Sequence, residues 1–139
     1  MVEIMYKRCK KIAEEAHSGQ TRWDGSPYIN HPIEVASKFT DEKLKCIAIL
    51  HDVIEDTNYD RLMLLARGVS EDIVLIVDVL SRGEYESYTD FIGRICKSKE
   101  AIKVKIDDIN HNLINLKKGN RRDKYELALT ILEHELWHN

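Results

Sequence analysis

The segment AILHDVIEDT starts with an apolar run and then places one imidazole and three carboxylates within the next six positions. His51 and Glu55 are four residues apart, as are Asp52 and Asp56, so each pair would share one face of a helix. We expect that helix to be buried on nearly every side, with its charged groups crowded at the C-terminal end, where the helix dipole is negative too. A bound divalent cation would relieve this repulsion.

Two adjacent side chains do not complete the coordination of a cation, so His51 and Asp52 require donors from elsewhere in the chain. We expect His31 to be one of these donors. It lies at the end of a loop rich in glycine and proline, and it is followed by Pro32, which could begin the next helix.

The fourth donor should be a carboxylate from the segment AIKVKIDDINHNLINL, which has the pattern of a helix. Apolar residues at spacings of three and four form its core stripe, and Asp108 flanks that stripe on the same edge as Lys105 and Asn112. Asp107 and His111 point to the opposite, wetter face. The sequence therefore predicts a metal site made of His31, His51, Asp52 and Asp108.

Three further histidines are interpreted as helix-end or surface residues, namely His17, His134 and His138. We expect the charged face that carries Asp107 and His111 to be solvated as well, because charged residues on a helix usually face water.

The composition is that of an ordinary globular protein, with 139 residues, 43% hydrophobic and 32% charged, and we expect one domain over residues 1–139. The formal charge of −3 provides no general basic field for duplex nucleic acid. No apolar run approaches the roughly 18 residues that span a membrane, and the first residues lack a signal-peptide pattern. Three widely spaced cysteines suit reduced core residues. We therefore expect a cytoplasmic protein that binds neither duplex nucleic acid nor a membrane, and nothing in the sequence specifies an oligomeric state.

Apolar residues repeat at helical spacing along most of the chain, and no stretch alternates as a strand would. Gly68 and Ser70 predict a joint, because glycine ends helices and serine begins them. Residues 18–32 form the one long irregular segment, and a structured loop of that length is usually functional. We expect an all-α bundle of about eight helices, at residues 1–17, 32–39, 41–55, 59–67, 71–82, 88–97, 99–117 and 121–137.

Three segments carry a family resemblance: AHSGQTRWDGSPYINHP at 16–32, AILHDVIEDT at 48–57 and VKIDDINHNL at 104–113. In this order they resemble the HD-domain phosphohydrolases, and within them the hydrolase domain of the RelA/SpoT group and the stand-alone small alarmone hydrolases. The resemblance implies a compact HD-type helical bundle. It also implies that the four residues selected above hold the metal, usually manganese.

The resemblance implies roles for other residues too. Glu55 and Asp56 correspond to the pair that polarises and orients the attacking water. Arg22 is similar to the arginine that contacts the base, and Asn112 to the asparagine near the ribose. Lys105 is a candidate counter-charge for the phosphates.

The reaction implied by the resemblance is removal of the 3′-pyrophosphate from the guanosine alarmones (p)ppGpp, which gives GDP or GTP and pyrophosphate. At this length there is no room for a synthetase domain, so we expect no synthesis. The sequence departs from the family's pattern at two places. Trp23 stands where the family often has a basic residue, and the segment that is usually ADRLHN in the family is DDINHN here, at residues 107–112. Two alternatives therefore stay open. One is the same chemistry on another phosphorylated ribose, such as another nucleotide, the 2′-phosphate of NADPH or an RNA end. The other is a non-catalytic HD module that binds a nucleotide.

Overall fold

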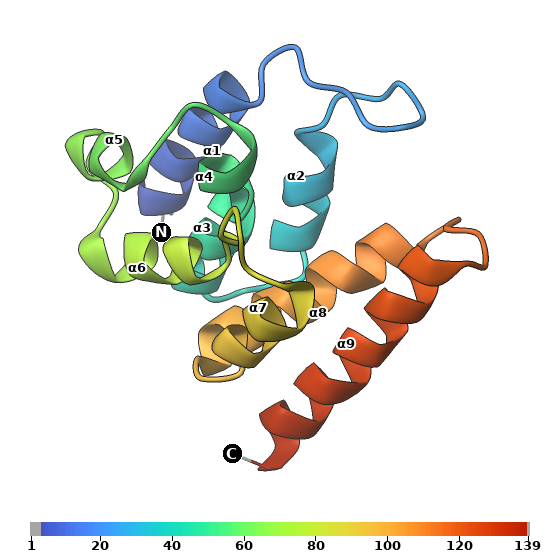
Figure 1. The fold of residues 1–139 in the computed structure, drawn as a ribbon. Coiled ribbons are helices and arrows are strands. Elements are labelled where there is room, and N and C mark those ends of the chain that lie inside the picture. Colours follow the sequence, from blue (N-terminus) through green and yellow to red (C-terminus); the bar gives the residue numbers. More distant parts are fainter. Residues whose placement is uncertain (1–3, 139) are drawn as a thin grey trace.

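Residues 4–138 are described by a computed structural model, and their regular elements are α-helices. In chain order these are α1 (Ile4–Ala16), α2 (Asn30–Ala36), α3 (Glu42–Leu50), α4 (Val53–Asp56), α5 (Arg61–Ala66), α6 (Glu71–Val79), α7 (Tyr88–Ile95), α8 (Lys99–Leu113) and α9 (Asn120–His138). Between α1 and α2 the chain forms a long loop, in which Thr21 and Pro27 make an isolated bridge (Figure 1). The all-α prediction is confirmed.

Helix α3 lies at the centre of the fold and contacts α1, α2, α6 and α8. Its N-terminus is capped by Asp41, whose carboxylate accepts a hydrogen bond of 3.0 Å from the backbone N–H of Leu44. Residues 46–50 are fully buried. Because neighbouring helices enclose α3, the residues that follow its C-terminal end are held in a fixed position.

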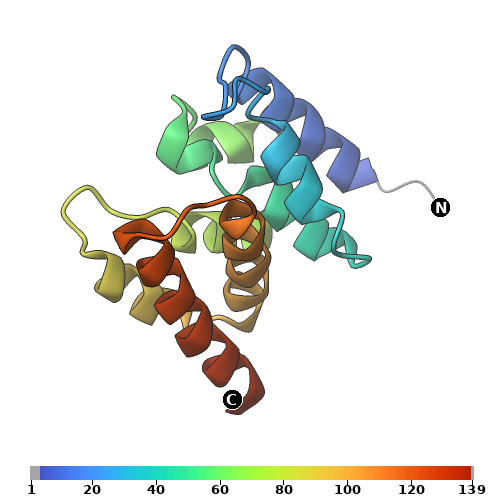
Figure 2. The ribbon, with the colours of Figure 1, turned by 90° about the vertical axis from the view of Figure 1, so that its right-hand side faces the viewer.

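Helices α8 and α9 lie side by side (Figures 1 and 2). Helix α8 also contacts α2, α3 and α6, so it joins the C-terminal part of the chain to the central helix. Its first turn is capped by Ser98, whose hydroxyl oxygen accepts from the N–H of Ala101 at 3.2 Å. Among residues 4–138, the length and apolar character needed to cross a membrane are not found in any helix.

The prediction of one helix over residues 41–55 is wrong. The chain forms two helices, α3 and α4, with His51 and Asp52 in the turn between them. Both the backbone N–H and the imidazole Nδ1 of His51 lie close to the carbonyl oxygen of Ala48, at 3.4 and 2.6 Å. In a continuing helix that oxygen would accept from the N–H of Asp52, so the competing contacts end α3 at this point.

Other predicted helices are present with shifted ends. The helix predicted at 99–117 ends at Leu113, because Ile114 is extended and Asn115 adopts a left-handed φ of 64°, which asparagine tolerates. The first three residues of the helix predicted at 1–17 lie outside the described residues.

The predicted joint between α5 and α6 is present. Gly68 follows α5 with a φ of 89°, and Ser70 precedes the first turn of α6. Helix α2 begins at Asn30, so His31 and Pro32 lie inside its first turn.

Candidate active site

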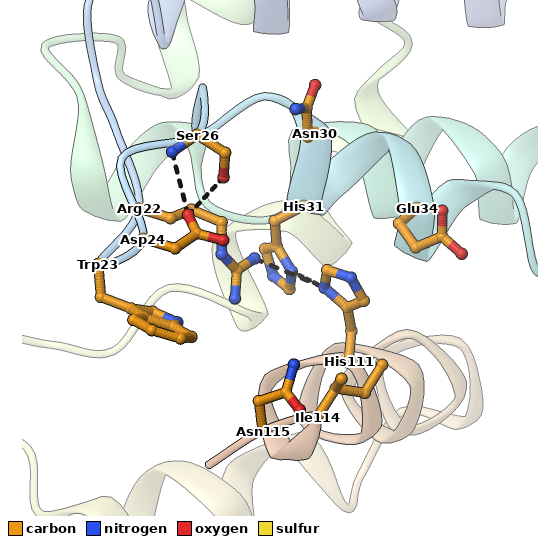
Figure 3. A pocket seen from close by; sticks show the side chains of 10 residues that line it. All are labelled: Arg22, Trp23, Asp24, Ser26, Asn30, His31, Glu34, His111, Ile114 and Asn115. Atoms are coloured by element: carbon orange, nitrogen blue, oxygen red, sulfur yellow. Dashed lines mark hydrogen bonds between the residues drawn. The ribbon is translucent and has the colours of Figure 1, made fainter.

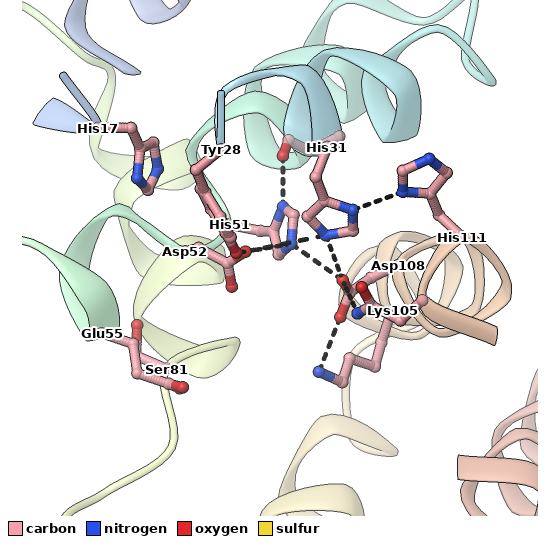
Figure 4. A network of polar contacts seen from close by, with 12 residues as sticks. His17, Tyr28, His31, His51, Asp52, Glu55, Ser81, Lys105, Asp108 and His111 are labelled. Carbon is pink, nitrogen blue, oxygen red and sulfur yellow. Dashed lines mark hydrogen bonds and ion pairs between the residues drawn. The ribbon is translucent and has the colours of Figure 1, made fainter. Parts of the chain in front are cut away.

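Four potential metal ligands converge where the end of α3, the start of α2 and the middle of α8 meet (Figure 4). One donor atom from each lies within 4.8 Å of all the others, and the residues are His31, His51, Asp52 and Asp108. The carboxylate oxygen Oδ1 of Asp108 is 2.8 Å from Nε2 of His31 and 3.2 Å from Nε2 of His51. Oδ2 of Asp52 is 2.9 Å from Nε2 of His51 and 3.9 Å from Nε2 of His31. This cluster of imidazoles and carboxylates could hold a metal ion.

The hydrogen bond to Ala48 fixes the tautomer of His51. A carbonyl oxygen only accepts, so Nδ1 of His51 carries the proton of this 2.6 Å contact, and Nε2 faces the carboxylates. Burial would lower the pKa of His51, but Asp52 and Asp108 outweigh it and raise the pKa well above its usual value. The imidazole can therefore supply positive charge between the carboxylates, in the place that a cation would take.

Asp52 is oriented by Tyr28, which comes from the loop between α1 and α2. The Tyr28 hydroxyl donates a short hydrogen bond to Oδ2 of Asp52. Burial and the charge of Asp52 both raise the pKa of Tyr28, so the phenol keeps its proton and remains a donor. The loop thus orients Asp52, one of the four potential ligands, through a residue that is not itself a ligand.

Asp108 is held by two neighbours on its own helix. Nζ of Lys105 lies 2.9 Å from Oδ2, and the side-chain amide of Asn112 donates to Oδ1 at 3.1 Å. Burial would raise the pKa of Asp108, but Lys105 and His51 hold it well below its usual range, so the carboxylate stays charged. Of the two adjacent aspartates, Asp108 lies in the cluster, whereas Asp107 is half-buried outside it.

His111 also lies at the site, and the prediction that it points to a wetter face is wrong. Its Nδ1 is 2.7 Å from Nδ1 of His31, and the two rings are stacked. Helix α2 packs against α8, and its His31 contacts His111 on the face that the sequence pattern assigned to solvent, so His111 is half-buried there. Burial, followed by the charges of His31 and Arg22, lowers the pKa of His111, so its neutral ring can accept a hydrogen bond from Nδ1–H of His31.

The two predicted catalytic carboxylates differ in their surroundings. Oε1 of Glu55 accepts from the backbone N–H of Arg82 at 2.6 Å, and Glu55 stands apart from the four donors in Figure 4. Burial, followed by the charges of Asp52 and Glu55, raises the pKa of Asp56 to about 6. A carboxyl group with a pKa near neutrality is suited to proton transfer.

Arg22 ties the long loop to α8. Its Nη2 donates to the side-chain oxygen of Asn112 at 3.1 Å, and its Nη1 lies 3.5 Å from Nδ1 of His111. A cavity of about 300 Å³ opens between this loop, α2 and the end of α8, and His31 forms part of its wall (Figure 3). Arg22, the predicted base contact, and Asn112, the predicted ribose contact, are therefore hydrogen-bonded to each other beside the cluster.

The sequence interpretation missed three residues of the site, namely His17, Tyr28 and His111. His17 lies at a helix end, directly after α1, but it is buried and does not lie on the surface. Its Nδ1 lies 2.8 Å from the side-chain oxygen of Gln20, and its ring centroid is 4.9 Å from that of Tyr28. For His111 a signal was present in the sequence, because residues three apart on a helix are neighbours and Asp108 precedes it by three.

No protein-family model matches the chain, but known proteins resemble it. The sequence is 33% identical over 119 residues to a protein of Haemophilus influenzae named guanosine-3′,5′-bis(diphosphate) 3′-pyrophosphohydrolase, a match that covers 76% of this chain and 18% of that protein. It is 34% identical over 119 residues to the bifunctional (p)ppGpp synthase/hydrolase SpoT of Escherichia coli, covering 76% of this chain and 17% of SpoT. The chain thus spans less than a fifth of the length of these curated relatives.

A solved structure, described as a metazoan ortholog of SpoT that hydrolyzes ppGpp, superposes with a TM-score of 0.77. The match covers 96% of this chain and 86% of that one, at 23% sequence identity. This chain and the solved structure share a fold. The resemblance to the hydrolase domains of the RelA/SpoT group is confirmed by the sequence relatives.

Proposed function

We propose that residues 1–139 form one HD-type phosphohydrolase domain that removes the 3′-pyrophosphate from (p)ppGpp, giving GDP or GTP and pyrophosphate. The observation that carries this proposal is the convergence of His31, His51, Asp52 and Asp108 beside a cavity wide enough for part of a nucleotide. The names of the curated relatives support the choice of substrate.

We propose that these four residues hold a manganese ion. Two imidazole nitrogens and two carboxylate oxygens, without a thiolate, suit manganese or another hard-to-borderline cation. When bound, such a cation supplies charge neutralisation at the phosphoryl oxygens and makes water a usable nucleophile near neutral pH. The partners of the ligands support this assignment, because metal-binding histidines usually donate their other ring N–H to a fixed acceptor, as His51 does to Ala48.

The remaining residues would act on the water and on the substrate. We assign Glu55, which the Arg82 amide fixes, to take the proton of the water, and Asp56, whose pKa is near 6, to align the water. We assign Arg22, which lines the cavity, to the base, and Asn112, which is hydrogen-bonded to Arg22, to the ribose. For Lys105 a contact with the phosphates stays a prediction, and its present partner is Asp108.

The test is a manganese-supplemented assay on ppGpp with chromatographic identification of the products. His51→Ala should abolish turnover, and Glu55→Gln should abolish turnover but retain metal binding. His138→Ala is the matched control, because His138 lies on the exposed end of α9 and should leave the rate unchanged. GDP and pyrophosphate as products would support the proposal.

A panel of other substrates separates the alternatives. Turnover of another nucleotide, of NADPH or of an RNA end, with ppGpp left intact, would favour the same chemistry on a different phosphorylated ribose. Nucleotide binding without any turnover would favour the non-catalytic module. A cytoplasmic location and the absence of duplex nucleic acid and membrane partners remain predictions of the sequence.

A further inference from the structure

The last helix, α9, carries large apolar side chains that the described part of the chain leaves exposed. Its inner face packs on α8 and buries Ala128 and Leu132. On another face, Leu127 is 64% exposed and Ile131 is 40% exposed. These two residues are four apart, so they lie side by side on the surface of α9. Figures 1 and 2 show α9 at the edge of the molecule, which leaves this face open to a second protein.

A groove of about 300 Å³ adjoins this face and lies between α7 and α9. Leu127 and Ile131 form part of its α9 wall, and Ile92 and Gly93 form part of its α7 wall. Most of the lining is apolar, so the groove is stabilised when another apolar surface displaces its water. An apolar groove beside exposed apolar side chains is typical of a surface that binds another protein.

Gly93 leaves the floor of this groove open. It lies inside α7, where glycine is less favourable than alanine because it loses more conformational freedom on folding. Its backbone is not in the left-handed region, and an added Cβ would meet no atom within 4 Å outside its own stretch of helix. Neither the backbone conformation nor the packing of the described residues therefore requires a glycine here. Glycine is common where a second backbone approaches closely, which agrees with a helix docked in the groove.

The two ends of the exposed face differ in charge. At one end lies Lys124, which belongs to the groove wall. Burial lowers the pKa of Lys124, and the positive charges of Arg82 and Arg121 lower it further, so positive charge is concentrated at this end. At the other end, Glu135 lies near the end of α7, and burial, followed by the charge of Glu135, raises the pKa of the Cys96 thiol there. The face is therefore basic at the start of α9 and acidic toward its end.

The order of residues along this face is self-complementary. From the start of α9 the face presents, at spacings of three and four, Lys124, Leu127, Ile131 and Glu135. This spacing keeps the four residues on one side of the helix. A second α9 in the opposite direction, related by a two-fold axis near Leu129, would place Leu127 against the partner's Ile131. The same rotation would place Lys124 against the partner's Glu135, and the opposed helix dipoles would attract as well.

We propose that this face of α9, with the adjoining groove, is the interface of a homodimer in which the two α9 helices pack antiparallel. A two-fold dimer uses the same surface patch on both subunits, so that patch has to complement itself in shape and in charge. The occupant of the groove is thus α9 of the second copy, which would also contact α7 at Gly93. This inference is independent of the proposed function, because the face includes none of the four clustered donors.

Sedimentation equilibrium of the full chain measures the association, and the parent should approach twice the mass of one chain as its concentration rises. Leu127→Ser removes apolar contact, and Gly93→Gln places a long side chain on the floor of the groove. Each should raise the dissociation constant of the dimer by about 10-fold or more. Gly93→Gln improves helix propensity, so its effect would not come from unfolding of α7. Trp137→Ser is the matched control, because Trp137 is 81% exposed on α9 but lies on a different face, and it should associate like the parent.

Charge reversal tests the antiparallel arrangement. Lys124→Glu would bring two carboxylates together, and Glu135→Lys would bring two ammonium groups together, so each change alone should weaken the dimer by about 10-fold. The two changes combined should restore most of the association, because each pair regains opposite charges. Parallel α9 helices would place Lys124 against the partner's Lys124, and the combined variant would then recover nothing.

The outcomes decide for or against this interface. A parent protein that stays monomeric up to its highest soluble concentration would overturn the proposal. A dimer that Leu127→Ser and Gly93→Gln leave unchanged would overturn it too, because its interface would lie elsewhere. Failure of the combined charge variant to recover association would overturn the antiparallel arrangement, and the proposal with it. Since these experiments record mass and not turnover, none of the results depends on whether ppGpp is hydrolysed.

Discussion

Replacing Asp56 with asparagine should stabilise the metal-free protein near neutral pH. Burial and the neighbouring carboxylates Asp52 and Glu55 raise the pKa of Asp56 from 3.8 to about 6. The folded state therefore holds this proton more tightly than the unfolded state does. The stability that Asp56 contributes by holding this proton is fully present below about pH 4 and is lost as the pH rises through about 6. Above that pH the charged carboxylate opposes folding.

The size of the effect follows from the shift in pKa. Each pKa unit corresponds to about 1.4 kcal/mol, which gives about 3 kcal/mol for a group fully shielded from water. Asp56 is only partly buried, and water screens its repulsion, so we expect about 1 kcal/mol. Since asparagine has the shape of the carboxyl group without its charge, Asp56→Asn should recover this free energy of unfolding at about pH 8.

Urea denaturation in the presence of a chelator measures this difference. At about pH 8 the midpoint of Asp56→Asn should be about 0.5 M higher than that of the parent, and at about pH 3.5 the two midpoints should coincide. Glu84→Gln, an exposed carboxylate in the α6–α7 loop, is the control and should change little. A variant that is equally stable or less stable than the parent at about pH 8 would refute the reasoning, and so would a gain that does not depend on pH.

The other predictions concern the partners of the ligands. Tyr28→Phe removes the donor to Asp52 without changing the packing, so manganese affinity should fall by about 10-fold or more in calorimetry. His111→Ala removes the partner of the His31 ring and should weaken manganese binding by about 10- to 100-fold, whereas unchanged affinity would show that the ring contact is incidental. Lys105→Met leaves the Asp108 carboxylate buried without its ammonium partner, so the free energy of unfolding in chelator should fall by about 3 kcal/mol; adding Asp108→Asn should restore part of it.

The sequence predicted the parts of the site that local pattern determines. The spacing of apolar residues in α8 placed Asp108, and not Asp107, toward the core, because a helix fixes which residues share an edge. The density of glycine and proline identified the long loop that carries Arg22 and ends near His31. The charge of AILHDVIEDT indicated a cation between these acids, and the structure brings the four donors together.

The sequence did not predict what tertiary contacts determine. The apolar pattern continues through Val53 and Ile54, so nothing in the spacing showed that α3 ends at Leu50; the contacts of His51 with the Ala48 carbonyl end it. The surroundings of His111 depend on the packing of α2 against α8, and those of His17 on the loop between α1 and α2. The spacing of residues on a helix assigns each residue to a face, but it does not show which neighbouring element packs against that face.

The most direct test of the central claim is anomalous diffraction at the manganese edge from crystals grown with manganese and GDP. One strong peak should lie between Nε2 of His31, Nε2 of His51 and the carboxylates of Asp52 and Asp108, and it should be lost in His51→Ala crystals. A peak at another place in the parent protein, or none at saturating manganese, would contradict the account.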